Sequence, residues 1–292
     1  MNRPLDLGPP EDFRVARQLD VLIPTRNRPA ELAVTLSGLA AQEGVGDFGV
    51  VVSDQSDGEA AYRHPAAATM VRALRHRGHP VLLTRRLPRR GLAEHRAALL
   101  AASAARYVLC LDDDVWLEPD TLRRLVTAIE ELGCGFVGNA VHGLSYADDV
   151  RPATHRHYEE WDGPPTPERI RPGTPEWERA SIHPAANLLH VTQKLRLAPG
   201  AWRAYKVSWI GGCVLYDRAK LVDSGGFEFW RQVPDNHQGE DVAAQLAVLA
   251  RHGGAGVLPS GAYHLESPTT VTERDVEAWE VVLADEDAPQ PA

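Results

Sequence analysis

The first half of the chain alternates short apolar runs with stretches in which apolar residues recur at helical spacing. The apolar runs, typical of buried strands, cover residues 20–24, 48–53, 81–84, 107–111 and 136–140. The helical stretches cover residues 31–41, 69–76, 92–105 and 119–132. Strands that are apolar throughout and alternate with helices favour a mostly parallel sheet. The pattern therefore predicts a Rossmann-like α/β fold with helices on both faces of the sheet.

This alternation stops between residues 142 and 206. The segment has many prolines and few periodic apolar runs, and it carries Trp161, Trp177 and Trp202. A long irregular segment inside a compact domain is often a functional loop or lid. The alternative is a surface excursion that packs on its own tryptophans, and the sequence leaves both interpretations open.

Regular spacing returns after residue 206. It predicts two strands, at 207–216 (VSWIGGCVLY, kinked at its glycines) and 256–259, and two helices, at 218–224 and 241–251. We expect a disordered tail from Ala284. The chain thus divides into five parts. They are a leader (1–17), a first half (18–141), an irregular insertion (142–206), a second half (207–270) and a C-terminal helix with its tail (271–292).

Composition narrows the class of protein. The formal net charge of the 292 residues is -9, which argues against nucleic-acid binding because that needs a basic face. Cys110, Cys134 and Cys213 form no CxxC pair, so no zinc motif is present, and a sparse odd count is typical of a reducing compartment. No signal peptide opens the sequence, and no run approaches the roughly 20 apolar residues of a transmembrane segment. We expect a cytoplasmic protein, and peripheral contact with a membrane stays open.

The strongest chemical signal is the aspartate triad Asp112-Asp113-Asp114, directly after the apolar run YVLCL. It falls at the carboxyl end of a predicted central strand, where α/β sheets bind ligands. Three adjacent carboxylates repel one another unless a cation or strong donors compensate. Carboxylate oxygens suit Mg²⁺ or Mn²⁺ bridging a diphosphate. The alternative is an exposed acidic turn before the next helix.

Two further polar motifs follow predicted strands. Pro24-Thr25-Arg26-Asn27-Arg28 combines a turn, a hydroxyl and two guanidinium groups, which offer planar donors to phosphate. Asp54, in SDQSDG, can accept a hydrogen bond from a base or a sugar hydroxyl. Ordinary turns explain both motifs equally well when each is taken alone. A basic run, Arg85 to Arg90, is either a solvated loop or a further anion attractor.

The motifs occur in the order IPTRNRP, VVSDQSDG, GLAEHRAALL and LCLDDDVW, which resembles the family 2 glycosyltransferases of GT-A fold. The resemblance covers about residues 19–140. It implies transfer of a sugar from a nucleoside diphosphate, with a UDP-sugar the commonest donor, to an acceptor that the sequence does not identify. The sequence departs from the usual family pattern at SDQS, where a DDGS-like turn is common, and at Ala97, where an asparagine is usual.

The resemblance also implies residue roles. One group would bind the nucleotide sugar, with Asp54 on the base and Asp112 on the ribose and sugar: Pro24, Thr25, Arg26, Arg28, Asp54, Gly91, Arg96, Asp112 and Asp113. Asp114 would coordinate the divalent cation, Mn²⁺ or Mg²⁺. His264 resembles the histidine that several GT-A enzymes return to the metal near the chain end, although a surface histidine is the alternative. Trp209, Gly211 and Gly212 resemble a glycine-bearing strand beside the acceptor.

The second half contributes a candidate base. Glu240 and Asp241 open a predicted helix, and similar pairs in the family supply the general base of an inverting transfer. We choose Asp241, expecting the helix dipole to keep it ionised, with Glu240 as the alternative. The alternative is that these two acidic residues only stabilise the N-terminus of the helix and take no part in catalysis.

Three other functions were compared with the sequence motifs. A haloacid-dehalogenase-like phosphatase also places DxD after a strand, but there it ends the first strand, whereas three strands precede it here. A metal-dependent nucleotidyltransferase would need a glycine-rich phosphate loop with a lysine, which the first strand lacks. A non-catalytic module that binds nucleotide sugars would not need acids in both halves.

Overall fold

The computed structural model describes residue 13, residues 15–269 and residues 275–286. Most of the predicted leader (1–12 and 14) and the end of the predicted tail (287–292) lie outside these residues. The tail was predicted from Ala284, but α8 (Ala278–Glu286) continues through that position, so this boundary was wrong. Among the described residues, no helix combines the length and the apolar character needed to cross a bilayer.

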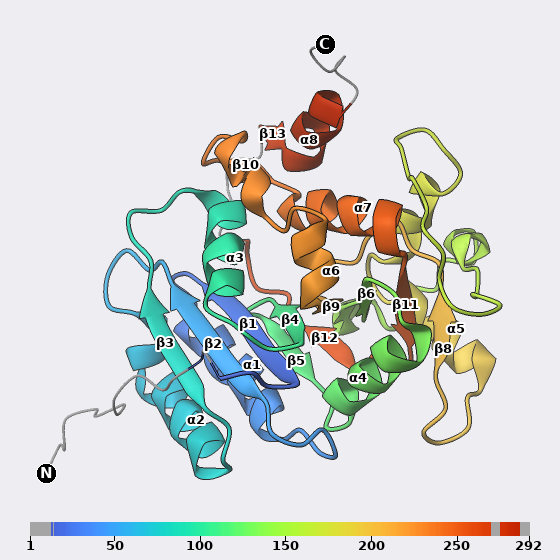
Figure 1. Ribbon diagram of the computed structural model, residues 1–292. Helices are drawn as coiled ribbons and strands as arrows, with labels where there is room; N and C mark the ends of the chain where they lie inside the picture. The colour runs from blue at the N-terminus through green and yellow to red at the C-terminus, as the bar shows by residue number, and fades with distance from the viewer. Residues whose placement is uncertain (1–12, 14, 270–274, 287–292) are drawn as a thin grey trace, which may run out of the picture.

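An eight-stranded sheet forms the centre of the protein (Figure 1). Its strands, in spatial order, are β3 (Val81–Arg85), β2 (Gly49–Asp54), β1 (Leu19–Thr25), β4 (Tyr107–Leu111), β9 (Cys213–Asp217), β6 (Phe136–Gly138), β11 (Gly254–Leu258) and β8 (Arg203–Tyr205). The first four are parallel, β9 is antiparallel to both neighbours, and β6 and β11 are again parallel. β8 closes the edge in antiparallel orientation. The predicted mostly parallel α/β sheet is confirmed.

Two small sheets lie beside the central one. One contains β5 (Val115–Leu117), β12 (Ala262–His264) and β7 (His142–Gly143), and the other pairs β10 (His237–Gln238) with β13 (Val276–Glu277). The first brings residue 264 back to the strand that follows the aspartate triad, because His264 pairs with Val115. The second fastens the C-terminal segment to the loop before α7 (Glu240–His252).

Helices cover both faces of the sheet because successive strand residues point to opposite sides. In β1, Val21 and Ile23 join the core beneath α1 (Pro29–Ala40), α2 (Pro65–His76) and α4 (Thr121–Leu132). Leu22 joins the core on the other face, with α3 (Gly91–Ala101), α5 (Asn187–Leu195), α6 (Arg218–Asp223) and α7. Short 3₁₀ turns complete the elements: η1 (Ala61–Arg63), η2 (Leu144–Tyr146), η3 (Thr154–His157), η4 (Trp177–Ile182) and η5 (Glu228–Arg231).

The predicted strand at 207–216 was partly wrong. Only its end becomes β9, which starts at Cys213 after the two glycines. Ile210 instead hydrogen-bonds to the side chain of Gln245 on α7: Gln245 Oε1 accepts from the Ile210 amide at 2.8 Å, and Gln245 Nε2 donates to the Ile210 carbonyl at 2.8 Å. The fully buried Gln245 side chain thus provides hydrogen bonds to the Ile210 amide and carbonyl, which have no partner on a neighbouring strand. Gly212 then turns the chain into β9 with a φ of 79°.

The segment 142–206 is more regular than its pattern predicts. It contains α5 and β8, and β8 becomes an edge strand of the main sheet. Of its tryptophans, Trp177 packs on two rings from outside the segment: its centroid lies 4.7 Å from that of Trp209 and 4.9 Å from that of Trp279. The elements are too short for hydrophobic periodicity to reveal them.

Replacing Gln245 with leucine should lower the free energy of unfolding by about 1–3 kcal/mol for each backbone group left without a partner. The Ile210 amide and carbonyl would both lose their hydrogen bonds in a buried position. Chemical denaturation measures the change. Gln193→Leu, at an exposed position of α5, is the matched control and should shift stability by less than about 0.5 kcal/mol. Equal effects of the two substitutions would contradict this role of Gln245.

Candidate functional site

A cavity of about 1050 Å³ opens at the carboxyl ends of β1 and β4, as the triad position predicts. It is large enough for a nucleotide-sized ligand. Both halves of the chain contribute lining residues that the sequence predicts: Pro24, Thr25, Arg26, Arg28, Gly91, Arg96, Asp112, Asp113, Asp114, Gly211, Gly212, Glu240, Asp241 and His264. None of residues 142–206, all of which the structure describes, lines it, so a lid role for that segment stays a prediction.

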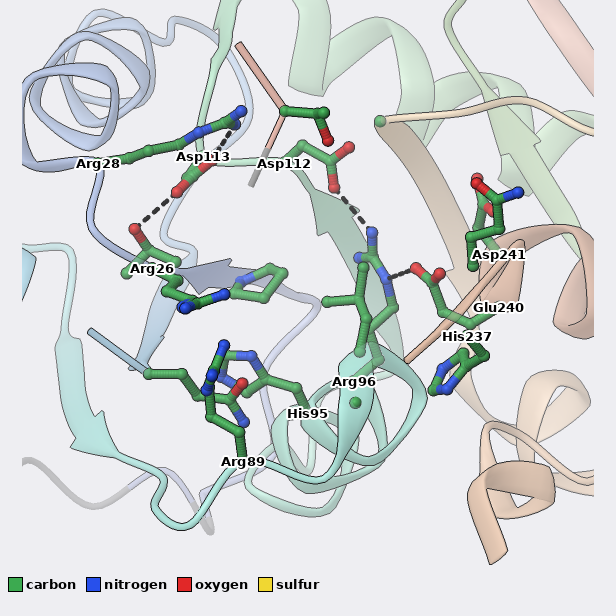
Figure 2. A pocket seen from close by; sticks show the side chains of 18 of the residues that line it. Arg26, Arg28, Arg89, His95, Arg96, Asp112, Asp113, His237, Glu240 and Asp241 are labelled. Atoms are coloured by element: carbon green, nitrogen blue, oxygen red, sulfur yellow. Dashed lines mark hydrogen bonds and ion pairs between the residues drawn. The ribbon is translucent and has the colours of Figure 1, made fainter. Parts of the chain in front are cut away.

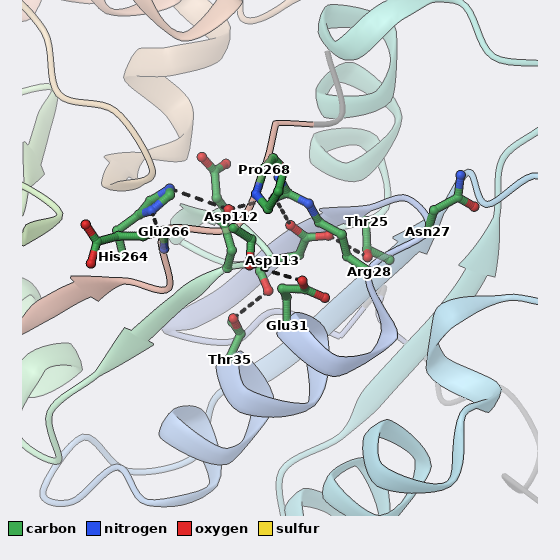
Figure 3. A network of polar contacts seen from close by, with 12 residues as sticks. Thr25, Asn27, Arg28, Glu31, Thr35, Asp112, Asp113, His264, Glu266 and Pro268 are labelled. Atoms are coloured by element: carbon green, nitrogen blue, oxygen red, sulfur yellow. Dashed lines mark hydrogen bonds and ion pairs between the residues drawn. The ribbon is translucent and has the colours of Figure 1, made fainter. Parts of the chain in front are cut away.

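Arg28 holds the last two aspartates of the triad. Its Nη1 donates to Asp113 Oδ1 at 3.1 Å and to Asp114 Oδ2 at 2.6 Å, and its Nη2 donates to the Pro268 carbonyl (Figure 3). The hydroxyl of Thr25 donates to Asp113 Oδ2 at 2.7 Å. Burial nevertheless raises the pKa of Asp113 to about 7, and burial together with Asp112 raises that of Asp114. The donors around these carboxylates therefore do not fully offset their loss of hydration.

Arg96 joins the first aspartate of the triad to the second half of the chain. Its Nη2 donates to Asp112 Oδ1 at 2.7 Å, and its Nε donates to Glu240 Oε1 at 2.8 Å (Figure 2). The side chain is 5% exposed. Burial lowers the pKa of Arg96, but Asp112 and Glu240 outweigh this effect and raise it well above its usual value. The guanidinium is therefore a fixed charge that bridges β4 and α7.

Asp241 stands beside Glu240 but has different partners. Its Oδ1 accepts a hydrogen bond from the Val242 amide at 2.9 Å, and its Oδ2 points toward Gly211, where an added Cβ would lie 3.8 Å away. Burial and the neighbouring Glu240 raise the pKa of Asp241 to about 7. Burial and a like charge thus act against the expectation that the helix dipole keeps this aspartate ionised.

The start of α3 is fixed by a residue that the sequence analysis did not single out. His237 Nε2 accepts a hydrogen bond from the Ala93 amide at 3.0 Å, while its Nδ1 donates to the Pro234 carbonyl at 2.6 Å. The histidine lies so close to Gly91 that a Cβ there would be 2.5 Å from its ring, and Gly91 also has a φ of 82°. Gly91 therefore serves close packing at the cavity wall.

The structure does not bring two predicted residues to the cavity. Asp54 is fully buried, and its oxygens accept from the Ser56 amide, the Ser56 hydroxyl and the Ala61 amide at 2.8–2.9 Å. Asp54 therefore lies in an ordinary turn, as the alternative explanation of the SDQSDG motif has it. Trp209 packs on Trp177 instead of lining the cavity.

The neighbour of Asp54, Gln55, does line the cavity. Its Nε2 and His95 Nε2 are buried without a hydrogen-bond partner. Burial lowers the pKa of His95 to about 3, so its ring is neutral at physiological pH. A polar residue directly after a strand indicates a position at the edge of the sheet where the cavity opens. The sequence alone does not show whether Asp54 or Gln55 faces that cavity.

Two side chains at the cavity carry donor types that a divalent cation accepts. Asp114 Oδ2 lies 3.4 Å from His264 Nε2, and carboxylate oxygen with imidazole nitrogen suits Mn²⁺. Among the described residues, six carboxylates line the cavity, those of the triad, Asp235, Glu240 and Asp241, against the four guanidinium groups of Arg26, Arg28, Arg89 and Arg96. Within the described part of the chain, no three Asp, Glu, His or Cys side chains form a ready-made metal site. Further ligands would have to come from a bound molecule.

Comparisons with known proteins agree with this geometry. The Glycosyl transferase family 2 model matches residues 20–194, more than half of the chain. Curated protein sequences give no match. The crystal structure of S. aureus TarS superposes with a TM-score of 0.51 at 17% identity, covering 86% of this chain and 37% of that one.

S. aureus TarS 1–349 in complex with UDP-GlcNAc gives a TM-score of 0.52 at 16% identity, covering 87% of this chain and 60% of that one. This chain thus spans less than two thirds of these proteins, and a likeness at such identity shows a shared fold. Together with the family match over the triad and the motifs before it, these findings show that the chain belongs to the family 2 glycosyltransferases and has their GT-A fold.

Proposed function

We propose that the protein transfers a sugar from a nucleoside diphosphate, UDP in the first instance, to an acceptor hydroxyl with inversion at the anomeric carbon. The observation that carries the proposal is the convergence of the aspartate triad and Asp241 on one cavity (Figure 2). The triad comes from the half of the chain that the family model covers, and Asp241 comes from α7. An inverting transfer in one displacement needs a site for the diphosphate and a separate base that takes the proton of the acceptor hydroxyl.

The donor would lie along the edge formed by β1 and β4. Arg26, Arg28 and Arg89 line that part of the cavity and offer guanidinium groups to the phosphates. Asp54 is held inside its own turn, so we assign the contact with the base to the Gln55 side chain in its place. Asp114 and His264 would hold the divalent cation, Mn²⁺ or Mg²⁺, whose charge would stabilise the departing diphosphate.

Asp241 is better placed to act as the base than Glu240. Glu240 is 4% exposed, and its Oε1 already accepts a hydrogen bond from Arg96 in a buried salt bridge. Asp241 faces Gly211, where the lack of a side chain lets an acceptor approach. The acceptor oxygen would bond to the anomeric carbon as its proton passes to Asp241. The bond to the diphosphate oxygen would break, and its electron pair would leave with the nucleotide.

Asp241→Asn should lower kcat by about two to four orders of magnitude while donor affinity stays nearly unchanged, because the amide keeps the shape and loses the basicity. Donor hydrolysis or transfer, together with calorimetric binding of UDP and Mn²⁺, separates the two effects. Proton NMR of the product gives its anomeric configuration. Near-normal turnover, or a product that retains the donor's configuration, would overturn the assignment and point to Glu240 or to a retaining mechanism.

The pH dependence of kcat should follow the raised pKa of Asp241. Below about pH 7 the carboxyl is protonated and cannot accept a proton, so kcat should fall as the pH drops through that value and level off above it. Rates measured from pH 5 to 9 test this expectation. Asp241→Asn should lose the acidic limb, and a limb that survives unchanged in this variant would belong to another group.

Asp114→Asn should weaken the Mn²⁺-dependent binding of UDP or GDP at least about tenfold, since a carboxylate ligand is replaced by a neutral amide. The measurement is a thermal-shift titration, because a ligand that binds only the folded state raises Tm. Asp120→Asn, at a partly exposed aspartate that pairs with Arg124 on α4, is the control and should leave binding unchanged. Wild-type affinity in excess chelator would refute the metal requirement.

A further inference from the structure

Arg28 has three acceptors at once. Nη1 lies 2.6 Å from Asp114 Oδ2 and 3.1 Å from Asp113 Oδ1, and Nη2 donates to the Pro268 carbonyl on the segment that follows β12 (Figure 3). The guanidinium is largely enclosed, with 13% of the side chain exposed. Burial lowers the pKa of Arg28, but Asp113 and Asp114 raise it overall, so the group is a permanent cation at this position.

The oxygen that Arg28 holds is also the one that faces His264. Asp114 Oδ2 lies 3.4 Å from His264 Nε2, and the Nδ1 of that ring accepts a hydrogen bond from the Glu266 amide at 2.8 Å. A neutral ring whose Nδ1 accepts carries its proton on Nε2, so His264 would have to release the Glu266 amide before Nε2 could bind a metal. A divalent cation at Asp114 would compete with Arg28 for the oxygen that the guanidinium holds. A guanidinium at 2.6 Å occupies it and repels a second positive charge, because opposite charges attract and like charges repel most strongly where water is excluded.

We propose that Arg28 is a placeholder cation that keeps the divalent metal out of the site until a nucleoside diphosphate arrives. This inference rests on the proposed function and adds to it the order of binding. The diphosphate offers Arg28 an anionic partner of the planar, bidentate kind that guanidinium prefers. When the guanidinium transfers to it, Asp114 Oδ2 becomes available beside His264. Metal and nucleotide therefore bind with positive coupling, and by linkage each tightens the other by the same factor.

The transfer of Arg28 would also affect the segment after β12, which forms part of the wall of the cavity. Pro268 belongs to a stretch whose neighbour Ser267 donates to Glu31 on α1 at 3.0 Å, and Ser267 and Thr269 line the cavity. Transfer of Arg28 would remove the contact to the Pro268 carbonyl while the Ser267 contact remains. Arg28 thus acts as a positioning residue for both the metal ligand and this wall.

The test is calorimetric titration of Mn²⁺ into the full chain, with and without saturating UDP, and again with GDP. In the wild type, nucleotide should tighten Mn²⁺ binding about tenfold or more. In Arg28→Gln, Mn²⁺ alone should bind about tenfold more tightly than in the wild type, because the competing charge is gone. The coupling to nucleotide should become smaller than in the wild type, because the part due to displacing Arg28 is lost while the phosphates can still bind the metal, and Arg28→Lys, which keeps the charge, should stay closer to the wild type.

Arg26→Gln is the matched control. It removes a guanidinium from the same cavity, but Arg26 pairs with Asp57 at 3.1 Å and not with the triad, so Mn²⁺ alone should bind it as it binds the wild type. If Arg28→Gln binds Mn²⁺ no more tightly than the wild type, or if both arginine variants gain equally, the placeholder role is wrong. If neither nucleotide binds the wild type in the presence of Mn²⁺, the proposed function fails instead, while the titrations without nucleotide still test Arg28.

Discussion

The site depends on one buried cation, the guanidinium of Arg96. It bonds to Asp112 at the end of β4 and to Glu240 at the start of α7, two residues that are 128 positions apart in the chain. A buried charge is tolerated only when its partners are in place, and removing one partner of such a group is strongly destabilising. The geometry of the first and second halves is therefore linked, because Asp112 of the triad and the start of the helix that carries Asp241 share one guanidinium.

Arg96 and Arg28 divide the acidic cavity between them. Arg96 holds Asp112 and Glu240 and is fixed on all sides, whereas Arg28 holds Asp113 and Asp114 and reaches a backbone carbonyl. Burial still raises the pKa of Asp113, Asp114 and Asp241, so the two arginines do not fully offset the loss of hydration of these carboxylates.

Much of the first half could be predicted because its information is local. The apolar runs at β1, β2 and β4 are buried on both faces, so their sequence pattern is nearly continuous and their ends are marked by polar residues. Since parallel strands end at one edge of a sheet, the residues after β1 and β4 had to meet there. The rest of the chain was harder to predict. β8 and α5 are short, and the backbone of Ile210 hydrogen-bonds to the Gln245 side chain and not to a neighbouring strand.

The sequence by itself determined the parallel strands of the first half, the position of the triad at the sheet edge and the family resemblance, because these follow from periodicity and from motifs read along the chain. Only the tertiary structure decided which side chains face the cavity. Asp54 turns into its own loop and Gln55 turns toward the cavity, although the two are adjacent. His237 caps α3 from a distant loop, and Arg28 pairs with Asp114, the residue proposed to bind the metal. These contacts join residues far apart in sequence, and their geometry depends on how the elements pack, which no local pattern records.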